Sequence, residues 1–384
     1  MGKIKVAFFA DMLVENFDGA ARTIYQIIKR IDTEKYEYFF ITGSAPASNF
    51  PYKYYLVPSV DIPKNEDYKL AIPALSFFEM NNAMLIFKPD VIHISSPSFL
   101  GRYALDYARA NKIPVLSIYH THFISYIDYY FKDARLLIDA VKAFVISRNK
   151  SFYNGCDMVL VPSQSLLEEL SGYGFDQTRM VIWPRGMNTA MFSPDKKDAG
   201  LLLKEDIHKP VVLFVSRLVW EKNLLTLKDI YLLNEAAGSP YQFVIAGDGV
   251  ARDELQQSMP NALFLGSLQH EALSQWYATS SVFLFTSETE TYGNVVIEAM
   301  ASGLPVVVAD AGGPSDLVVS YENGIKCTPK DAPAFYEAVK HVLTDKVLRE
   351  KIIQNGLSFA KNLNWDKLVQ NYFEKVKGLA KSMA

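Results

Sequence analysis

The sequence contains few cysteines and no marked excess of charge of either sign. Cys156 and Cys327 are the only cysteines among 384 residues, too few for a disulfide framework or a cysteine-rich zinc site. This cysteine usage is typical of a reducing cytoplasm. The formal net charge of −3 gives no general electrostatic support for binding nucleic acid, so no nucleic-acid partner is expected.

Long apolar stretches and dinucleotide motifs are also missing. The apolar run in the N-terminal MGKIKVAFFADM is far too short for a signal peptide or a membrane-spanning helix. A G-x-G-x-x-G sequence occurs nowhere, which argues against an oxidoreductase that binds a dinucleotide. The sequence therefore predicts a cytoplasmic protein of another functional class.

What is present is the composition of a globular protein with two domains. Hydrophobic residues make up 49% of the chain and charged residues 21%, and 384 residues are long for a single core. Short apolar strands alternate with amphipathic helices, which is typical of parallel sheets covered on both faces. In the first half, the expected strands are Lys5–Ala10, Tyr38–Thr42, Val91–Ile94, Val115–Tyr119 and Met158–Val161. In the second half, they are Val211–Val215, Gln242–Ala246, Leu263–Leu265, Val282–Phe285 and Val306–Ala309.

The boundary between the two halves is expected near residue 188. Asn188–Pro210 is rich in Pro, Lys and Asp and lacks strand periodicity, so it is interpreted as a linker. Apolar residues recur at helical spacing from Trp365 to Leu379. We therefore expect domains at 1–187 and 188–364, followed by a C-terminal helix at 365–384.

The stretch from Ser287 to Leu317 carries the strongest functional signal. Its pattern predicts strand, loop, helix, strand and turn, with Glu290 in the loop and a helix that begins near Gly293. Backbone N–H groups at such a helix start suit a phosphate. Glu290 and Glu298, eight positions apart, are better suited to hydroxyl groups, such as those of a sugar and a ribose.

This stretch resembles the donor-site signature of retaining glycosyltransferases of family 4. The resemblance rests on E-x7-E followed by AMASGLPVVVADAGGPSDLV, and further segments match in the same order. It implies a GT-B fold, in which two Rossmann-like α/β domains with parallel sheets face each other across a cleft. It also implies that the final helix crosses back to the N-terminal domain, and that Tyr292, Gly293, Asn294 and Val295 belong to the donor site.

Two further segments after strands match the family's donor site. Arg217 and Lys222 resemble its R-x4-K element, which holds the diphosphate; the alternative is a pair of surface cations in a loop. Gly247 and Gly249 resemble its G-x-G turn, although many α/β turns look alike. No D-x-D pair occurs, so the sequence requires neither a metal ion nor another cofactor.

In the first half, the resemblance singles out His120 and Gly19. His120 follows a strand and matches a histidine that contacts the donor sugar. The match does not settle whether the neighbouring His122 has a packing role, and His93 is interpreted as structural. Gly19 lies where the family has a glycine-rich turn, with Ala20 in place of a second glycine. One glycine is expected to be enough for a tight turn at this position.

The segment Ser125–Tyr153 mixes aromatic and basic side chains. Such a segment could lie on an anionic membrane or receive a lipid-linked acceptor; a core helix with a basic face is the alternative. Together with YHTHF and RGMN, it resembles a subgroup of mannosyl-, glucosyl- and sulfoquinovosyl-transferases that act on lipids or cell-envelope glycans. The subgroup favours a peripheral location at the inner membrane face.

The resulting functional hypothesis is retaining transfer of a hexosyl group from a nucleotide-diphosphate sugar, GDP-mannose in the first instance, to a lipid or glycan hydroxyl. In the family mechanism His120, Arg217, Lys222 and Glu290 would carry catalysis, and Glu298 would hold the ribose. The alternatives are a UDP-sugar-dependent glucosyl, galactosyl or sulfoquinovosyl transferase, and a non-catalytic or epimerase-type protein of the same fold.

Overall fold

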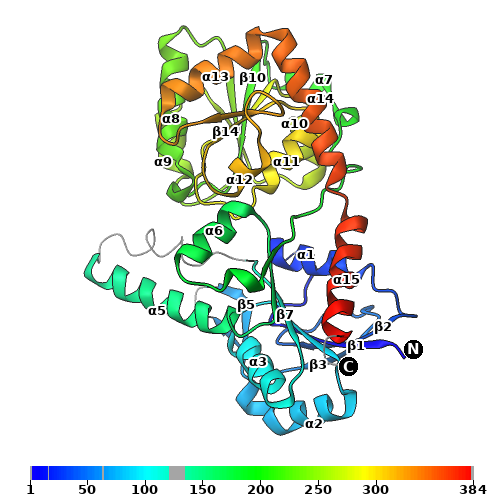
Figure 1. Cartoon of the computed structure of the whole chain (residues 1–384). Helices are drawn as coiled ribbons and strands as arrows, with labels where there is room; N and C mark the ends of the chain where they lie inside the picture. Colours follow the sequence, from blue (N-terminus) through cyan, green and yellow to red (C-terminus); the bar gives the residue numbers. More distant parts are fainter. Residues whose placement is uncertain (1, 16, 63–64, 121–134, 382–384) are drawn as a thin grey trace. The chain divides into compact units, whose positions relative to one another are not determined.

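The structure is a computed structural model that describes residues 2–15, 17–62, 65–120 and 135–381. The chain forms two compact units (Figure 1). The first comprises Met1–Pro162, Leu167–Trp183 and Asp366–Ala384, and the second comprises Ser163–Leu166 and Pro184–Trp365.

The first unit is built on a parallel seven-stranded sheet of order β3-β2-β1-β6-β7-β8-β9. Its strands are β1 (Ile4–Ala10), β2 (Tyr36–Thr42), β3 (Lys53–Leu56), β6 (Val91–Ile94), β7 (Val115–Ile118), β8 (Met158–Val161) and β9 (Met180–Ile182). An antiparallel pair, β4 (Ser59–Ile62) and β5 (Asn65–Ala71), stands apart. The helices before β9 are α1 (Gly19–Ile28), η1 (Pro73–Ser76), α2 (Phe77–Phe87), α3 (Phe99–Asn111), α5 (Arg135–Tyr153), α6 (Gln164–Gly172) and η2 (Gln177–Arg179).

The second unit is built on a parallel six-stranded sheet of order β12-β11-β10-β13-β14-β15. Its strands are β10 (Val211–Val215), β11 (Gln242–Ala246), β12 (Leu263–Gly266), β13 (Val282–Phe285), β14 (Val306–Ala309) and β15 (Ile325–Cys327). Its helices are η3 (Pro194–Lys196), α7 (Ala199–Lys204), η4 (Trp220–Lys222), α8 (Leu224–Ala236), α9 (Arg252–Ser258), α10 (His270–Thr279), α11 (Asn294–Ala301), α12 (Gly312–Leu317), α13 (Ala332–Thr344) and α14 (Lys346–Asn362).

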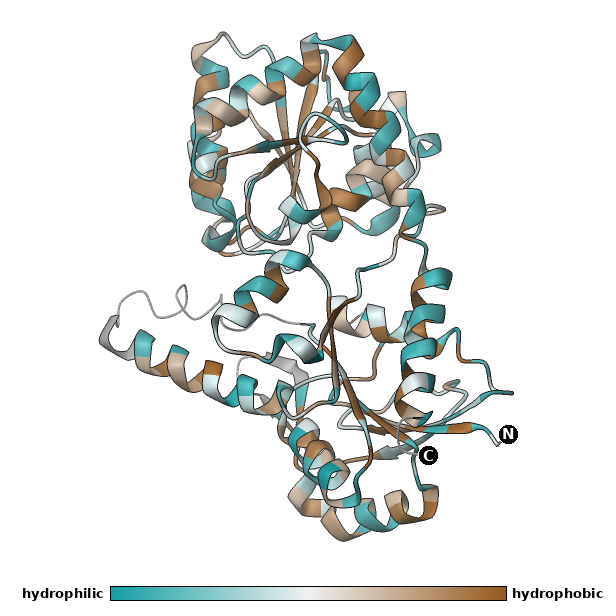
Figure 2. Ribbon diagram, viewed as in Figure 1, coloured by the Kyte–Doolittle hydropathy of each residue, from teal (hydrophilic) through white to brown (hydrophobic). Residues whose placement is uncertain are grey.

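The central strands of both sheets are buried on both faces, as their continuous apolar sequences require. Every residue of β6, β10, β13 and β14 is buried, and Figure 2 shows the sheet strands of the second unit coloured as hydrophobic. A parallel sheet with two apolar faces is stable when helices cover both sides. The two expected α/β domains with parallel sheets are confirmed.

Each sheet has one position where the chain reverses the direction in which it adds strands. In the first unit, the chain moves outward from β1 to β2 and β3 and then returns to the other side of β1 with β6. In the second unit, it moves from β10 to β11 and β12 and returns beside β10 with β13. In open α/β sheets, ligands bind at the carboxyl ends of the strands at such a switch point.

The final helix, α15 (Trp365–Lys381), packs on the first unit from Asp366 onward. Trp183 Nε1 donates a hydrogen bond to the carbonyl of Leu368 at 3.0 Å, and Arg30 pairs with Asp366. His93 is fully buried, and its Nδ1 lies 2.7 Å from the hydroxyl of Tyr372. His93 therefore has the structural role that the sequence predicted.

Segment 188–210, predicted to be a linker, packs as part of the second unit. Phe192 and Ile207 are buried in that unit's core, and Asp198 caps α7. The sequence predicted a linker because Phe192 and Ile207 are too few among the polar residues of this segment to give a periodic apolar pattern. The two units divide between Trp183 and Pro184.

None of the helices in the described part of the chain is both long and apolar enough to cross a bilayer.

Candidate functional site

The loops after β10 and β13, at the switch point of the second unit, bring Lys222 and Glu290 together. Lys222 Nζ lies 2.8 Å from Glu290 Oε1, and the two side chains are 2% and 29% exposed. The sequence assigned the lysine to a phosphate and the glutamate to hydroxyls, without foreseeing this ion pair. Because β10 and β13 are adjacent parallel strands, their following loops meet at one edge of the sheet.

Side-chain hydrogen bonds to the backbone hold these two loops in register. Thr286 Oγ1 donates to the carbonyls of Lys222 (3.2 Å) and Asn223 (3.1 Å). In return, Asn223 Nδ2 donates to Thr286 O at 3.3 Å and to Glu288 Oε1 at 3.0 Å. Asn223 adopts a left-handed conformation (φ 54°) between η4 and α8, which turns the chain after Lys222. The ammonium of Lys222 is thus fixed by its backbone as well as by Glu290.

Arg217 lies just after the carboxyl end of β10, in the loop that also contains Lys222. Unlike Lys222, Arg217 is exposed. The switch point therefore presents one accessible guanidinium and one buried ammonium. An exposed planar fork of donors can bind two phosphate oxygens. The buried ammonium of Lys222 can act on a ligand through its positive charge and by holding the carboxylate of Glu290 in place.

Gly247 and Gly249 are required by the close approach of the loops after β10 and β11. Their φ angles are 136° and 155°, and a Cβ would lie 1.8 Å from Ser216 O and 2.4 Å from Leu218 O. Leu218 N donates to Asp248 O at 2.8 Å, which joins the loops further. In this structure, both glycines serve backbone packing beside Arg217; their predicted contact with a donor stays a prediction.

Helix α11 begins at Asn294, as predicted, after Gly293 at φ 91°. A Cβ on Gly293 would lie 2.8 Å from Pro314 Cγ, so this position requires glycine for its conformation and for packing. Asn294 is exposed and Val295 half-buried in the first helical turn. Val296 N donates to the carbonyl of the N-cap residue Gly293 at 3.0 Å, and the N–H groups before it at this helix start can receive an anion.

Tyr292 is buried, and its hydroxyl donates a hydrogen bond to the carbonyl of Arg185 at 3.3 Å. Burial raises the pKa of Tyr292, so the phenol stays neutral and keeps its proton for this bond. Burial also lowers the pKa of Arg185 to about 10, which leaves the guanidinium charged at neutral pH. The buried Tyr292 side chain thus stabilises the loop that contains it through this hydrogen bond.

Glu298 lies on α11 and is held by a tyrosine of α10. Tyr277 OH donates to Glu298 Oε2 at 3.2 Å. Burial, followed by the charge of Glu298, raises the pKa of Tyr277 well above its usual value. Tyr277 therefore remains a neutral donor that orients the half-buried carboxylate.

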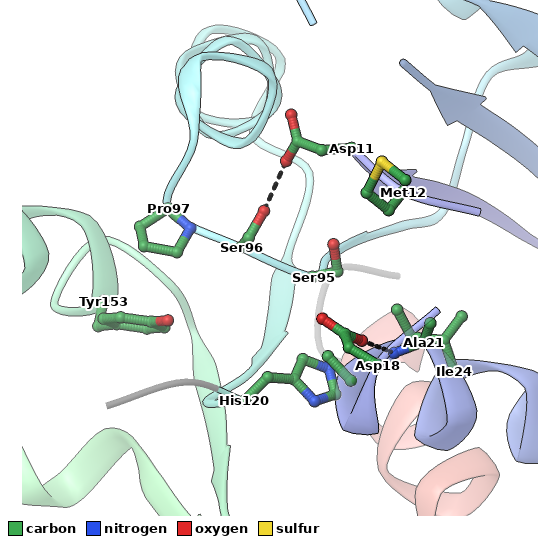
Figure 3. A pocket seen from close by; sticks show the side chains of 11 residues that line it. Asp11, Met12, Asp18, Ala21, Ile24, Ser95, Ser96, Pro97, His120 and Tyr153 are labelled. Carbon is green, nitrogen blue, oxygen red and sulfur yellow. Dashed lines mark hydrogen bonds between the residues drawn. The ribbon is translucent and has the colours of Figure 1, made fainter. Parts of the chain in front are cut away.

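The first unit has a cavity at its own switch point, between the ends of β1 and β6 (Figure 3). Ser96 Oγ donates to Asp11 Oδ2 at 2.7 Å, and Asp11 is only 3% exposed. Burial raises the pKa of Asp11, while the hydroxyls of Ser98 and Ser96 act in the opposite direction. His120 also lines this cavity, and Figure 3 shows its ring beside Asp18.

Gly19 does not form the tight turn that the sequence predicted. It is the first residue of α1, its φ is not positive, and a Cβ would meet nothing within 4 Å. The turn is stabilised instead by Asp18, whose Oδ1 accepts a hydrogen bond from Ala21 N at 2.7 Å. An N-cap side chain replaces the conformational freedom of glycine here.

Sequence reasoning missed Asp11 and Ser96. Both follow strands that were predicted. Polar side chains just after strands at a switch point indicate a ligand site, and this signal could have identified them. His122 and the aromatic residues 126–131 lie outside the described residues. Within the described ranges, no group of three or more His, Cys, Asp or Glu side chains could hold a metal ion.

Two family models match most of the chain. One described as Glycosyltransferase Family 4 matches residues 17–191, and one described as Glycosyl transferases group 1 matches residues 202–359. Together they span both units.

Curated relatives carry related names. A GDP-mannose-dependent alpha-mannosyltransferase of Mycobacterium tuberculosis is 31% identical over 84% of this chain and 83% of its own length. The sulfoquinovosyl transferase SQD2 of Arabidopsis thaliana is 32% identical over 73% of this chain, which spans 54% of that protein.

Solved structures share the fold. Sucrose-phosphate synthase from Thermosynechococcus elongatus superimposes with a TM-score of 0.75 at 20% identity, over 99% of this chain and all of that one.

Proposed function

Because the chain belongs to glycosyltransferase family 4, with the GT-B fold, we propose that it transfers mannose from GDP-mannose to a hydroxyl of a lipid or glycan in cell-envelope synthesis. Glycosyl transfer is the activity of the family; the donor and acceptor are the proposal. GDP-mannose is favoured by the mannosyltransferase relative, which aligns with most of this chain.

The observation that supports donor binding is the cluster at the switch point of the second unit. The exposed Arg217 and the first turn of α11 would receive the diphosphate. Lys222, paired with Glu290 at 2.8 Å, would add positive charge and hold the carboxylate for the sugar hydroxyls. Glu298, oriented by Tyr277, would accept hydrogen bonds from the ribose.

We propose front-face transfer with retention of the anomeric configuration. The bond between the anomeric carbon and the phosphate oxygen breaks as the acceptor oxygen bonds to that carbon on the same face. The acceptor proton passes to the departing diphosphate. Arg217, Lys222 and the α11 N-terminus would stabilise the negative charge that develops on this leaving group without a metal ion.

The donor is tested by thermal-shift screening against UDP-, GDP- and ADP-sugars, because a bound donor stabilises the fold by mass action. GDP-mannose should give the largest shift, and Glu298→Ala should reduce it. Proton NMR of the product should show an α-linked mannose, and turnover should persist in EDTA. An inverted product, or activity that needs added Mg²⁺ or Mn²⁺, would contradict the mechanism.

A UDP-sugar-dependent transferase is the second candidate. It is favoured by the sulfoquinovosyl transferase relative, whose identity over the matched region is similar to that of the mannosyltransferase. The same panel separates the candidates: a larger shift and transfer with a UDP-sugar would replace the mannosyl assignment and leave the site assignment intact.

We place the enzyme at the cytoplasmic face of the inner membrane as a peripheral protein. Exposed apolar side chains on the first unit support this location: Phe78 is 82% exposed and Ile86 73% on α2, and Phe144 is 62% exposed on α5. Such side chains insert into the lipid interface. Sedimentation with vesicles containing anionic lipid should retain the protein, and Phe78→Ser with Ile86→Ser should release it; equal sedimentation of both proteins would exclude this surface.

A further inference from the structure

Asn223 lies where a helix-capping side chain is expected, but it does not cap the helix. It is the residue before α8, its φ is 54°, and its side chain makes no hydrogen bond to the first backbone N–H groups of that helix. An asparagine at such a position usually accepts a hydrogen bond from the second or third helical N–H. The side chain of Asn223 is therefore available for another role.

The amide of Asn223 joins the loop after β10 to the loop after β13. Its Nδ2 donates to the carbonyl of Thr286 at 3.3 Å and to Glu288 Oε1 at 3.0 Å. Its Oδ1 accepts a hydrogen bond from the hydroxyl of Thr226 at 2.9 Å. Because Nδ2 faces two oxygen atoms that can only accept, the orientation of the amide is fixed. Both ends of the amide are occupied, and its amino end is directed at the loop after β13.

The Asn223–Glu288 bond connects the same two loops as the Lys222–Glu290 ion pair. Lys222 holds Glu290 at 2.8 Å. The next residue, Asn223, holds Glu288, which lies two positions before Glu290. We propose that Asn223 is a positioning residue for glycosyl transfer, and that its bond to Glu288 keeps the two loops at the separation that the ion pair requires. The inference rests on the proposed function, in which Lys222 and Glu290 belong to the donor site.

The carboxylate of Glu288 depends mainly on Asn223 for its position. The side chain of Glu288 is 27% exposed, and the ammonium of Lys330 lies 3.9 Å from its Oε2 but is 74% exposed. Such an exposed ion pair contributes little. The two hydrogen bonds from Thr286 Oγ1 to the carbonyls of Lys222 and Asn223 do not need the Asn223 side chain. Without that side chain the loops should therefore stay together but be held less tightly.

The alternative is that Asn223 serves only its left-handed backbone. Asparagine and glycine tolerate a φ of 54° better than most residues. Glycine keeps this backbone conformation and removes the amide, so Asn223→Gly separates the two explanations. If Asn223 served the turn alone, glycine would replace it without loss of activity.

The first test measures steady-state kinetics of the full chain with the nucleotide sugar that the thermal-shift panel selects. In Asn223→Gly, kcat should fall about 10- to 100-fold, the factor expected for one lost hydrogen bond to a charged group. The KM for the donor should change less than about threefold, because Arg217 and the start of α11 still receive the diphosphate. Lys112→Gly replaces another left-handed residue, at the end of α3 in the first unit (φ 55°), and is the matched control that should leave kcat unchanged. Wild-type kcat in Asn223→Gly would overturn the proposal.

A second pair of variants tests the bond itself. Asn223→Asp keeps the shape of the side chain but places an acceptor opposite the Glu288 carboxylate, so kcat should fall at least as far as in Asn223→Gly. Adding Glu288→Gln restores a donor opposite the new carboxylate and should raise kcat about tenfold, whereas Glu288→Gln alone should not raise it. A double variant no faster than Asn223→Asp would show that the two side chains do not act through their bond, and would overturn the proposal.

Hydrogen–deuterium exchange tests the contact between the loops without any nucleotide sugar. The backbone amides of residues 286–293 should exchange about tenfold faster in Asn223→Gly than in the wild type, because the loop opens more often. Unchanged exchange would overturn the proposal even if turnover falls. Faster exchange in a protein that shows no turnover with any nucleotide sugar would contradict the proposed function and support the contact.

Discussion

The two units share one sheet topology but place opposite chemistry at its switch point. In the second unit, the strand ends carry Arg217 and the buried Lys222–Glu290 pair. In the first, they carry Asp11 bonded to Ser96, beside Asp18. The topology thus determines where a ligand is received, and the loop residues determine its charge. The predictions below test this contrast, from the largest expected effect to the smallest.

Lys222→Ala should have the largest effect, because it removes the buried positive charge at the switch point of the second unit. We expect turnover to fall about 100- to 1000-fold, about 3–4 kcal/mol of transition-state stabilisation. The loss of fold stability should be smaller, since Glu290 is 29% exposed and can be solvated. Steady-state kinetics and thermal melting measure the two separately. Lys340→Ala, which replaces an exposed lysine on α13, is the control and should leave turnover unchanged. Wild-type turnover in Lys222→Ala would show that the Lys222 charge does not stabilise the transition state.

Gly247→Ala should destabilise the protein by roughly 2–4 kcal/mol. Its Cβ would lie 1.8 Å from a backbone oxygen that cannot move independently, and φ is 136°. Urea denaturation measures the change. A loss below about 0.5 kcal/mol would mean that the loops after β10 and β11 separate at little cost.

His93 should make stability depend on pH. Burial lowers its pKa to about 3, whereas an unfolded histidine titrates near 6.5. The unfolded chain therefore binds the proton first, so stability is complete above pH 6.5 and is lost as the pH falls toward 3. The loss should reach about 2 kcal/mol between pH 6.5 and 5. Denaturation curves of the wild type and His93→Gln should differ in this slope; parallel curves would show that His93 does not contribute.

Gly19→Ala should have the smallest effect and the opposite sign to Gly247→Ala. Alanine fits the open space at the start of α1 and restricts the unfolded chain, so stability should rise by about 0.5 kcal/mol. The same denaturation assay applies. A loss above 1 kcal/mol would show that the turn before α1 requires glycine after all.

Much of the fold could be predicted because its central strands are continuous apolar runs. Val211–Val215, Val282–Phe285 and Val306–Ala309 have the predicted bounds. The sequence did not predict β3, with mostly exposed side chains, or β15, three residues long with a central lysine, because neither has a distinct pattern. The antiparallel pair β4–β5 and the edge strand β9 were also missed.

The candidate site was predictable in its members but not in their contacts. Arg217, Lys222 and Glu290 each lie in a loop after a recognisable strand, and Glu298 lies one turn into a recognisable helix. The Lys222–Glu290 ion pair forms because β10 and β13 are neighbours in the sheet. That pairing joins strands distant in the sequence, so the sequence pattern alone does not show it. Asp11 was missed although it directly follows β1, because a single aspartate after a strand forms no motif that separates it from an ordinary loop residue.

The path of the chain between the units has a practical consequence for dissecting the enzyme. The second unit is essentially one continuous stretch, 184–365, whereas the first needs the last helix, which carries Tyr372, to cover Trp183 and His93. Cutting the gene once, after residue 183, would therefore expose part of the first unit's core and yield an unstable fragment. A first unit for separate study would need residues 366–381 fused behind residue 183, where the second unit is inserted in the native chain.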